Sequence, residues 1–159
     1  MKFTNSLIKG KLLKRYKRFF ADIKVNSKII TAHCPNTGSM QGLLDQGNEV
    51  LVTEHNDPKR KLKFTLEIIK AKKRYVGVNT HRANKIVNHG LENKLIPEFK
   101  TIKNIKPEFK FSDDTRFDFL CDDNLIEVKN VTLFRENDIA EFPDAVTSRG
   151  TKHLNMLIK

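Results

Sequence analysis

The chain has 159 residues and a mass of 18.4 kDa, enough for one ordinary domain or two small ones with a buried core. No uninterrupted apolar run exceeds three residues, so a transmembrane helix is excluded, and the chain start lacks the apolar stretch of a secretory signal. The two cysteines, Cys34 and Cys121, lie far apart in the sequence. We therefore expect a cytoplasmic protein without disulfides.

Positive charge is concentrated in the first half of the chain. Residues 1–80 hold 17 Lys and Arg against 6 Asp and Glu, whereas residues 81–159 hold 13 of each, so the whole chain carries a net charge of +11. A general enrichment of lysine in the organism is the alternative explanation, but it would not leave one half neutral. The asymmetry predicts a basic half that binds a polyanion such as nucleic acid, and a second half that concentrates carboxylates.

The first half is predicted to consist of short strands separated by turns. Apolar and polar residues alternate over 19–25, and a turn at Asn26-Ser27 precedes a return strand, which is typical of a β-hairpin. Four or five short strands favour a small barrel, and an oligonucleotide-binding (OB) barrel is the fold expected for residues 1–80. The expected strands are 19–25, 29–32, 49–53, 62–68 and 75–78.

The second half, residues 81–159, mixes helices and strands and is predicted to be an α/β domain, which makes the whole chain α+β. Thr80 is a candidate N-cap for a helix through 85–88, which we expect to end or kink at Gly90. A last helix is expected from Ser148 onward. The strands expected here are 109–111, 116–120 and 125–134.

A predicted acidic hairpin carries the side chains best suited to chemistry. A two-residue loop at Asp122-Asp123 would place Asp118 directly across from Glu127, and Lys129 would then share their face of the sheet. A loop centred one residue later preserves this arrangement, whereas a three-residue loop turns Asp118 to the opposite face. Two carboxylates and a lysine suit Mg²⁺ or Mn²⁺, which can activate water and stabilise charge on a phosphoryl oxygen. The alternative is an acidic turn followed by a solvated strand edge.

Basic and aromatic residues gather in the barrel half as a nucleic-acid surface requires. The cations can neutralise phosphates and Tyr16 can stack on a base, although Tyr16 is equally suited to the barrel core. Arg149 and Lys152 share one face of the last helix and are further candidates, with a solvated helix face as the alternative. The candidates in the barrel half are Lys11, Lys14, Arg15, Tyr16, Lys17, Arg18, Lys59, Arg60, Lys61, Lys72, Lys73 and Arg74.

Several stretches of the sequence resemble the sugar fermentation stimulation protein family. They are Ala32 to Met40, Val76 to His81, Arg116 to Leu120, Glu127 to Leu133, and Phe142 to Leu154 without Ser148 and Thr151. The resemblance implies an N-terminal OB-like barrel and a C-terminal restriction-endonuclease-like domain of the PD-(D/E)xK type. It also implies DNA binding of low sequence specificity and a link to sugar (maltose) metabolism. Within the resemblance, Asp118, Glu127 and Lys129 match the nuclease motif as catalytic residues, with Asp118 and Glu127 as metal ligands.

The resemblance further implies a longer chain, because family members continue past the helix that contains Lys159. We therefore expect residues 81–159 to form an incomplete domain with weak or no cleavage activity. Ala83 also stands where the family usually has proline.

Three functions remain open at this point. The first is a cytoplasmic DNA-binding regulator of sugar metabolism without catalysis, and the second is a Mg²⁺-dependent nuclease. The third is an RNA-binding module, since an OB barrel and positive charge do not distinguish RNA from DNA. No membrane is expected as a partner, and the oligomeric state stays open.

Overall fold

The structure is a computed structural model in which two compact units can be described. One unit contains residues 2–80 together with residues 130–146, and the other contains residues 81–129 and 147–159. The residues that the structure describes are 2–113, 115–134, 139–143, 151, 154, 155 and 158.

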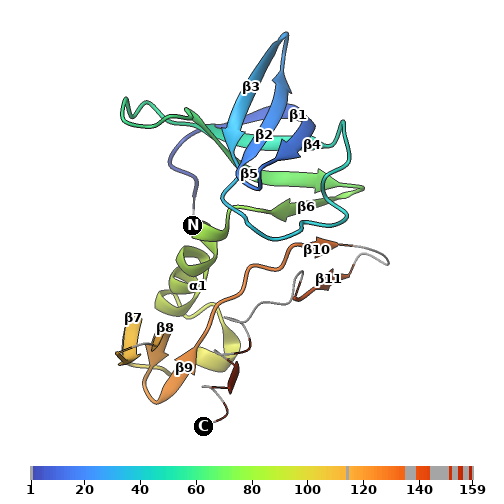
Figure 1. Ribbon diagram of the computed structural model, residues 1–159. Coiled ribbons are helices and arrows are strands. Elements are labelled where there is room, and N and C mark those ends of the chain that lie inside the picture. Colours follow the sequence, from blue (N-terminus) through green and yellow to red (C-terminus); the bar gives the residue numbers. More distant parts are fainter. Residues whose placement is uncertain are drawn as a thin grey trace. The chain divides into compact units, whose positions relative to one another are not determined.

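Five strands close into a barrel in the first unit, and a sixth extends the sheet (Figure 1). Along the sheet the order is β3-β2-β1-β4-β5-β6, and a parallel pairing of β3 with β5 closes the barrel. This connectivity is that of an OB fold, so the predicted N-terminal barrel and the α+β class are confirmed. The strands are β1 (Leu7–Tyr16), β2 (Phe20–Val25), β3 (Lys28–His33), β4 (Glu49–Glu54), β5 (Phe64–Ala71) and β6 (Arg74–Gly77).

The five strands predicted in this half are confirmed, but β1 was not predicted. Lysines and arginines interrupt its pattern, and only Gly10 and Leu12 are fully buried in it. The strand pairs with β4 through its first half and with β2 through its second half. At Gly10 the backbone comes close to β2, because a Cβ atom there would lie 2.5 Å from Cγ2 of Ile23 and 3.0 Å from the carbonyl oxygen of Lys24.

Gly10→Ala should therefore lower the free energy of unfolding by about 1–3 kcal/mol, since the added methyl group forces β1 and β2 apart. Gly77→Ala is the matched control, because a Cβ atom there meets nothing within 4 Å. Urea denaturation followed by circular dichroism measures both variants. Equal stabilities of the two variants would contradict the close approach at Gly10.

The barrel interior is mostly apolar and contains one buried carboxylate. Glu67 of β5 is 2% exposed, and its two carboxylate oxygens accept hydrogen bonds from the Thr53 hydroxyl (2.8 Å) and the Asn79 amide (2.9 Å). These bonds satisfy a charged group that burial alone would disfavour. The buried apolar residues are Leu12, Ala21, Ile23, Ala32, Cys34, Met40, Leu43, Val50, Val52, Leu66, Ile69, Ala71 and Val78.

The segment that follows residue 129 belongs to the barrel unit again. The Asn130 side chain donates a hydrogen bond to the carbonyl of Gly77 (3.3 Å), and the buried Asn36 donates one to the buried Thr132 hydroxyl (3.5 Å). The segment then continues as β10 (Leu133–Phe134), which pairs with β11 (Ala140–Glu141). The barrel unit is thus built from two separate parts of the chain.

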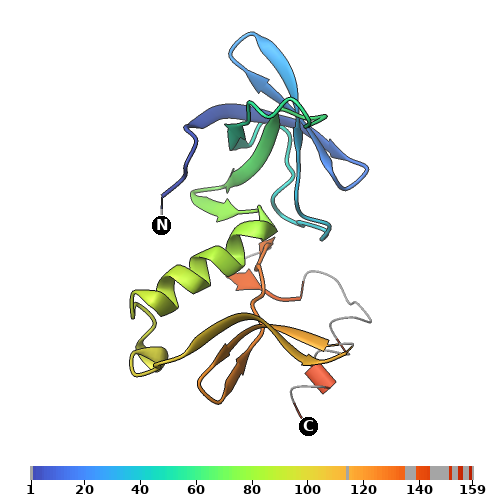
Figure 2. The same cartoon turned by 90° about the vertical axis from the view of Figure 1, so that its left-hand side faces the viewer.

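The second unit packs one helix on a three-stranded antiparallel sheet (Figure 2). The helix α1 (Ala83–Glu92) follows the 3₁₀ turn η1 (Thr80–Arg82), and a second turn, η2 (Pro97–Phe99), comes after it. The sheet contains β7 (Ile105–Ser112), β8 (Thr115–Cys121) and β9 (Asn124–Ile126) in that order. Its core is formed by Leu91, Phe119 and Cys121, with Val87, Ile96, Phe99, Ile102, Ile105, Ile126 and Val128 packed against them.

Three details of this unit differ from the sequence predictions. Thr80 does not cap α1, because its hydroxyl donates to the carbonyl of Pro35 (2.6 Å), and the helix continues through Gly90 to Glu92. Gly90 is buried, and a Cβ atom there would lie 3.2 Å from Ile96, so this glycine allows close packing instead of ending the helix. The strand predicted over 125–134 ends at Ile126.

The helix predicted near the end of the chain falls largely outside the described residues, within which Thr151, Leu154 and Asn155 are helical. In the part of the chain that the structure describes, no helix has the length and apolar character that crossing a membrane would require.

Candidate metal centre and nucleic-acid interface

The acidic hairpin has the register predicted from its turn residues. Cys121 pairs with Asn124, so Asp122-Asp123 is the two-residue loop, and the pairing continues to Phe119 and Ile126. Continued by one residue, this register would place Asp118 of β8 across from Glu127, which lies beyond the end of β9. The predicted two-residue loop is confirmed.

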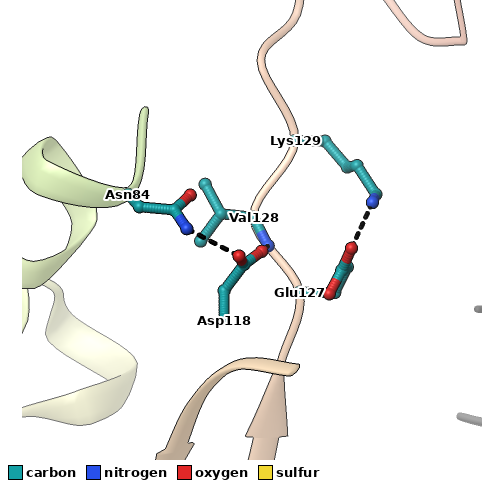
Figure 3. Close-up of polar contacts among 5 residues, drawn as sticks. All are labelled: Asn84, Asp118, Glu127, Val128 and Lys129. Carbon is teal, nitrogen blue, oxygen red and sulfur yellow. Dashed lines mark hydrogen bonds and ion pairs between the residues drawn. The ribbon is translucent and has the colours of Figure 1, made fainter. Parts of the chain in front are cut away.

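The Asp118 carboxylate is held by two hydrogen-bond donors (Figure 3). Its Oδ1 accepts a bond from Nδ2 of Asn84 in the first turn of α1 (2.6 Å), and its Oδ2 accepts one from the backbone amide of Val128 (2.7 Å). Because the Val128 amide bonds to a side chain, it is not available to continue the ladder between β8 and β9, which agrees with the end of β9 at Ile126. The carboxylate thus has a fixed orientation.

Glu127 and Lys129 are in contact with each other beyond the end of β9. Nζ of Lys129 lies 2.5 Å from Oε1 of Glu127, and the two side chains are 39% and 11% exposed, respectively. Figure 3 shows this pair directed away from the Asn84 and Val128 donors that hold Asp118. The prediction that Asp118, Glu127 and Lys129 share one face of the sheet assumed a strand that continues through Lys129. The strand ends at Ile126. Asp118 and Glu127 have different partners.

A hollow of about 440 Å³ lies beside Asp118, between α1 and strands β7 and β8. Glu108 of β7 also lines this hollow. Pro107 pairs with Phe119 and Phe109 pairs with Phe117, so Glu108 lies across the sheet from Asp118. The lining residues are Asn84, Lys85, Asn88, His89, Glu92, Pro107, Glu108, Asp118 and Phe119. Among the described residues, no group of three or more His, Cys, Asp or Glu side chains is arranged to hold a metal ion.

Sequence reasoning missed Asn84 and Glu108 as neighbours of Asp118. Asn84 follows the family-like stretch that ends at His81, but no spacing in the sequence relates it to a residue 34 positions later. The position of Glu108 is set by the register of β7 with β8, whose last pair is Ser112 with Thr115.

Asp122 has a structural role in the hairpin turn. It adopts a positive φ of 48°, and its carboxylate accepts bonds from the backbone amides of Lys103 (3.1 Å) and Asn104 (2.9 Å) and from the Asn104 side chain (3.0 Å). Hydrogen bonds from these backbone amides lower the pKa of Asp122 below its usual value. The turn is thereby tied to the segment that precedes β7.

This lowered pKa predicts a pH dependence of stability. A carboxyl group with a lower pKa in the folded state stabilises the fold above its unfolded pKa of about 3.9 and loses that contribution as the pH falls through the folded value. Asp122→Ala should therefore melt at a lower temperature than the wild type near neutral pH, and the difference should shrink in acid. Asp123→Ala removes the same charge from the same turn and is the control. A difference that does not change with pH would contradict the assignment.

Most of the barrel residues predicted to bind nucleic acid are exposed. They lie on β1, in the turn between β1 and β2, in the loop 55–63, and at the turn between β5 and β6. The exposed candidates are Lys11, Lys14, Lys17, Arg18, Lys59, Lys61, Lys72, Lys73 and Arg74. Arg149 and Lys152 lie outside the described residues.

Arg15 and Arg60 are half-buried and hold the loops around them. Arg15 donates to the carbonyls of Arg18 (3.1 Å) and Asn36 (2.8 Å). Arg60 donates to the carbonyl of Leu62 (3.2 Å) and the hydroxyl of Thr65 (2.8 Å). Each guanidinium group therefore fixes the backbone that presents its exposed neighbours.

Tyr16 is also half-buried, and its ring and hydroxyl both have partners within the barrel. Its hydroxyl donates to Oδ1 of Asp22 (3.2 Å), its ring stacks on Phe20 with centroids 5.5 Å apart, and Nζ of Lys14 lies 5.2 Å from the ring centroid. Tyr16 is not among the residues that form the barrel core, and its aromatic and hydroxyl contacts are with Phe20 and Asp22 of β2.

The fold and the hairpin together define a class of protein in which an OB barrel precedes a restriction-endonuclease-like unit. The family profile described as SfsA N-terminal OB domain matches residues 13–78, and the profile described as sugar fermentation stimulation protein RE domain matches residues 81–159. The chain belongs to the sugar fermentation stimulation protein family. The resemblance seen in the sequence is thereby confirmed.

Relatives of this family match the whole chain. The sugar fermentation stimulation protein homolog of Pelagibacter ubique is 64% identical over 163 residues, which cover 100% of this chain and 70% of that protein. The homolog of Alteromonas mediterranea is 46% identical, with 96% of this chain and 69% of that protein covered. The solved structure of Pyrococcus furiosus SfsA in complex with Ca²⁺ matches with a TM-score of 0.82 and 25% identity, over 99% of this chain and 68% of that one.

Proposed function

We propose that this chain is a DNA-binding protein of low sequence specificity that acts as a regulator linked to sugar metabolism. The observation that carries the proposal is the set of exposed cations on the barrel, within a half of the chain whose net charge is +11. Each cation that neutralises a phosphate releases counterions, so such a surface binds DNA without reading its sequence. The link to sugar metabolism rests on the family to which the chain belongs.

Strand pairing brings two of the cationic groups to the same end of the barrel. Phe20, directly after the β1–β2 turn, pairs with His33, and His33 pairs with Thr65. Thr65 in turn accepts a hydrogen bond from Arg60 of the loop 55–63. The exposed Lys17 and Arg18 and the exposed Lys59 and Lys61 therefore supply charge at one end of β5, whereas Lys72 and Lys73 lie at its other end.

DNA affinity should fall steeply with salt, and the two cationic turns should contribute unequally. Replacing Lys17 and Arg18 together by alanine should weaken duplex binding and reduce the slope of log K against log salt by about 1–2, because two phosphate contacts are lost. Replacing Lys72 and Lys73 removes the same charge from the other end of β5 and should have a smaller effect. Fluorescence anisotropy with a labelled duplex of random sequence measures both.

Two outcomes of this titration would contradict the proposal. Binding that does not depend on salt would contradict the electrostatic surface, and equal losses in the two double variants would contradict its placement. An RNA strand that displaces DNA of the same sequence at lower concentration would favour the RNA-binding alternative.

We further propose that Asp118 and Glu127 hold a divalent cation, Mg²⁺ or Mn²⁺, which requires the Glu127 side chain to leave Lys129 and turn toward Asp118. Carboxylate oxygens are the ligands that hard cations prefer, and with two carboxylates the ion would keep several waters. Asp118 is already oriented by Asn84 and Val128, and each of its oxygens retains a further lone pair. The relative from Pyrococcus furiosus was solved in complex with Ca²⁺, another cation that prefers oxygen ligands.

The cation site makes a Mg²⁺-dependent nuclease the second candidate function. A bound divalent cation lowers the pKa of a water ligand and stabilises charge on a phosphoryl oxygen. Lys129, which contacts Glu127, would orient a nucleophile at such a site, the role that the PD-(D/E)xK resemblance implies.

Asp118→Asn should abolish Mn²⁺ binding measured by calorimetry, because it removes one of two charged ligands. Asn84→Ala should weaken Mn²⁺ binding about 10- to 100-fold, since it frees the orientation of a ligand without removing it. Lys129→Ala should leave Mn²⁺ affinity nearly intact and lower any metal-dependent cleavage of labelled DNA. Asp123→Asn, in the neighbouring turn, is the control.

The same variants separate the two proposed functions. Asp118→Asn should bind DNA as well as the wild type or slightly more tightly, because a negative charge near the phosphates is gone. Absence of Mn²⁺ binding to the wild type would contradict the cation site and leave the DNA-binding proposal standing.

A further inference from the structure

The turn between β1 and β2 presents an aromatic ring on a strained but well-held backbone. Phe19 is 44% exposed, and the two residues before it, Lys17 and Arg18, have positive φ angles of 47° and 62°. Such angles are uncommon for residues other than glycine and tend to occur at functional sites when the surroundings hold them. Here Arg15 donates to the carbonyl of Arg18 (3.1 Å), and the backbone amide of Cys34 donates to the carbonyl of Phe19 (2.7 Å).

Phe19 belongs to a group of four rings at this end of the barrel. Its ring lies nearly parallel to that of His33, with an interplanar angle of 20° and centroids 6.4 Å apart. Tyr16 and Phe20 stack beside them at 15° and 5.5 Å, and Phe20 is the strand partner of His33. The Phe19 backbone is therefore held by a hydrogen bond, and its ring is supported by the ring of His33.

Cations flank the exposed ring. Lys17 and Arg18 precede it directly, and the pairing of His33 with Thr65 brings the loop that carries Lys59 and Lys61 to the same end. A fixed aromatic ring between cations suits a nucleobase whose flanking phosphates contact those cations. In a duplex each base already stacks on its neighbours, so the ring has no free base face to cover.

We propose that Phe19, supported by His33, is a stacking site for one unpaired nucleobase, so that the barrel binds single-stranded DNA more tightly than duplex DNA of the same sequence. This inference rests on the proposed DNA-binding function and assigns the strandedness of its ligand. Tyr16, for which the sequence left base stacking and the barrel core open, contacts Phe20 and Asp22 of the neighbouring strand.

The first experiment separates stacking from charge. Anisotropy titrations of the full chain use three labelled ligands: a short single strand of mixed sequence, its duplex, and a strand of the same length made of abasic nucleotides. Phe19→Ala should weaken binding of the base-bearing strand about 5- to 100-fold, because one stacked base is lost. Binding of the duplex and of the abasic strand should stay nearly unchanged, as should the salt slope, since Phe19 carries no charge.

Ile29→Ala is the matched control for this titration. Ile29 is 68% exposed and lies on β3, as His33 does. It pairs with Lys24 near the tip of the β2–β3 hairpin, whereas His33 pairs with Phe20 at the other end. Its loss should leave all three affinities nearly unchanged. Thermal unfolding of both variants checks that the barrel remains folded.

The second experiment uses the absence of tryptophan from the sequence. Phe19→Trp introduces a single indole that should retain single-strand affinity, and its emission should be quenched by the base-bearing strand and not by the abasic strand. In Ile29→Trp the emission should not respond to either strand.

Three results would overturn the stacking site. They are an unchanged single-strand affinity in Phe19→Ala, an equal loss for all three ligands, and an indole at position 19 that does not respond to the base-bearing strand. In each of these cases wild-type binding to the duplex would still support the proposed function. A wild-type chain that binds none of the three ligands would overturn both.

Discussion

The parallel pairing of β3 with β5 is the interaction on which the barrel and its proposed binding surface depend. Only two residue pairs form it, Ala32 with Phe64 and His33 with Thr65, and the partners are separated by 32 positions in the sequence. Without this pairing the sheet would be open, with two free edges. With it, the β1–β2 turn, His33 of β3 and the loop 55–63 come to the same end, so residues from three parts of the chain contribute to one surface. The arrangement of charge is thus a consequence of barrel closure.

In the second unit, the Asp118 carboxylate connects three elements that the chain visits separately. Its bonds to Asn84 and to the Val128 amide join α1, β8 and the segment after β9. A carboxylate whose two oxygens accept bonds from amide donors loses its freedom to rotate, which favours capture of a cation. The same bond to Val128 accompanies the end of β9, so the position of Glu127 and Lys129 depends on Asp118 as well.

The sequence was sufficient where local patterns decide the structure. Alternation and turn residues identified β2 to β6, and the Asp122-Asp123 loop, one of those considered for the hairpin, is the loop observed, because both depend on neighbouring residues. It was insufficient where distant groups decide. The lysines of β1 mask the pattern of a strand in which only Gly10 and Leu12 are buried. Gly90 lies inside its helix and packs closely on Ile96, which no local pattern in the sequence indicates. The contact between Asn84 and Asp118 depends on how α1 packs on the sheet, which no local pattern in the sequence determines.

The return of residues 130–134 to the barrel limits how this protein can be rearranged by recombination. Asn130 and Thr132 supply partners to Gly77 and Asn36, so the barrel is completed by residues encoded after the entire α1–β9 region. A gene fusion that exchanges only the first 80 codons between relatives would combine a barrel from one parent with residues 130–134 from the other. We expect the two units to be inherited together, with differences accumulating in place and not through shuffling of separate modules.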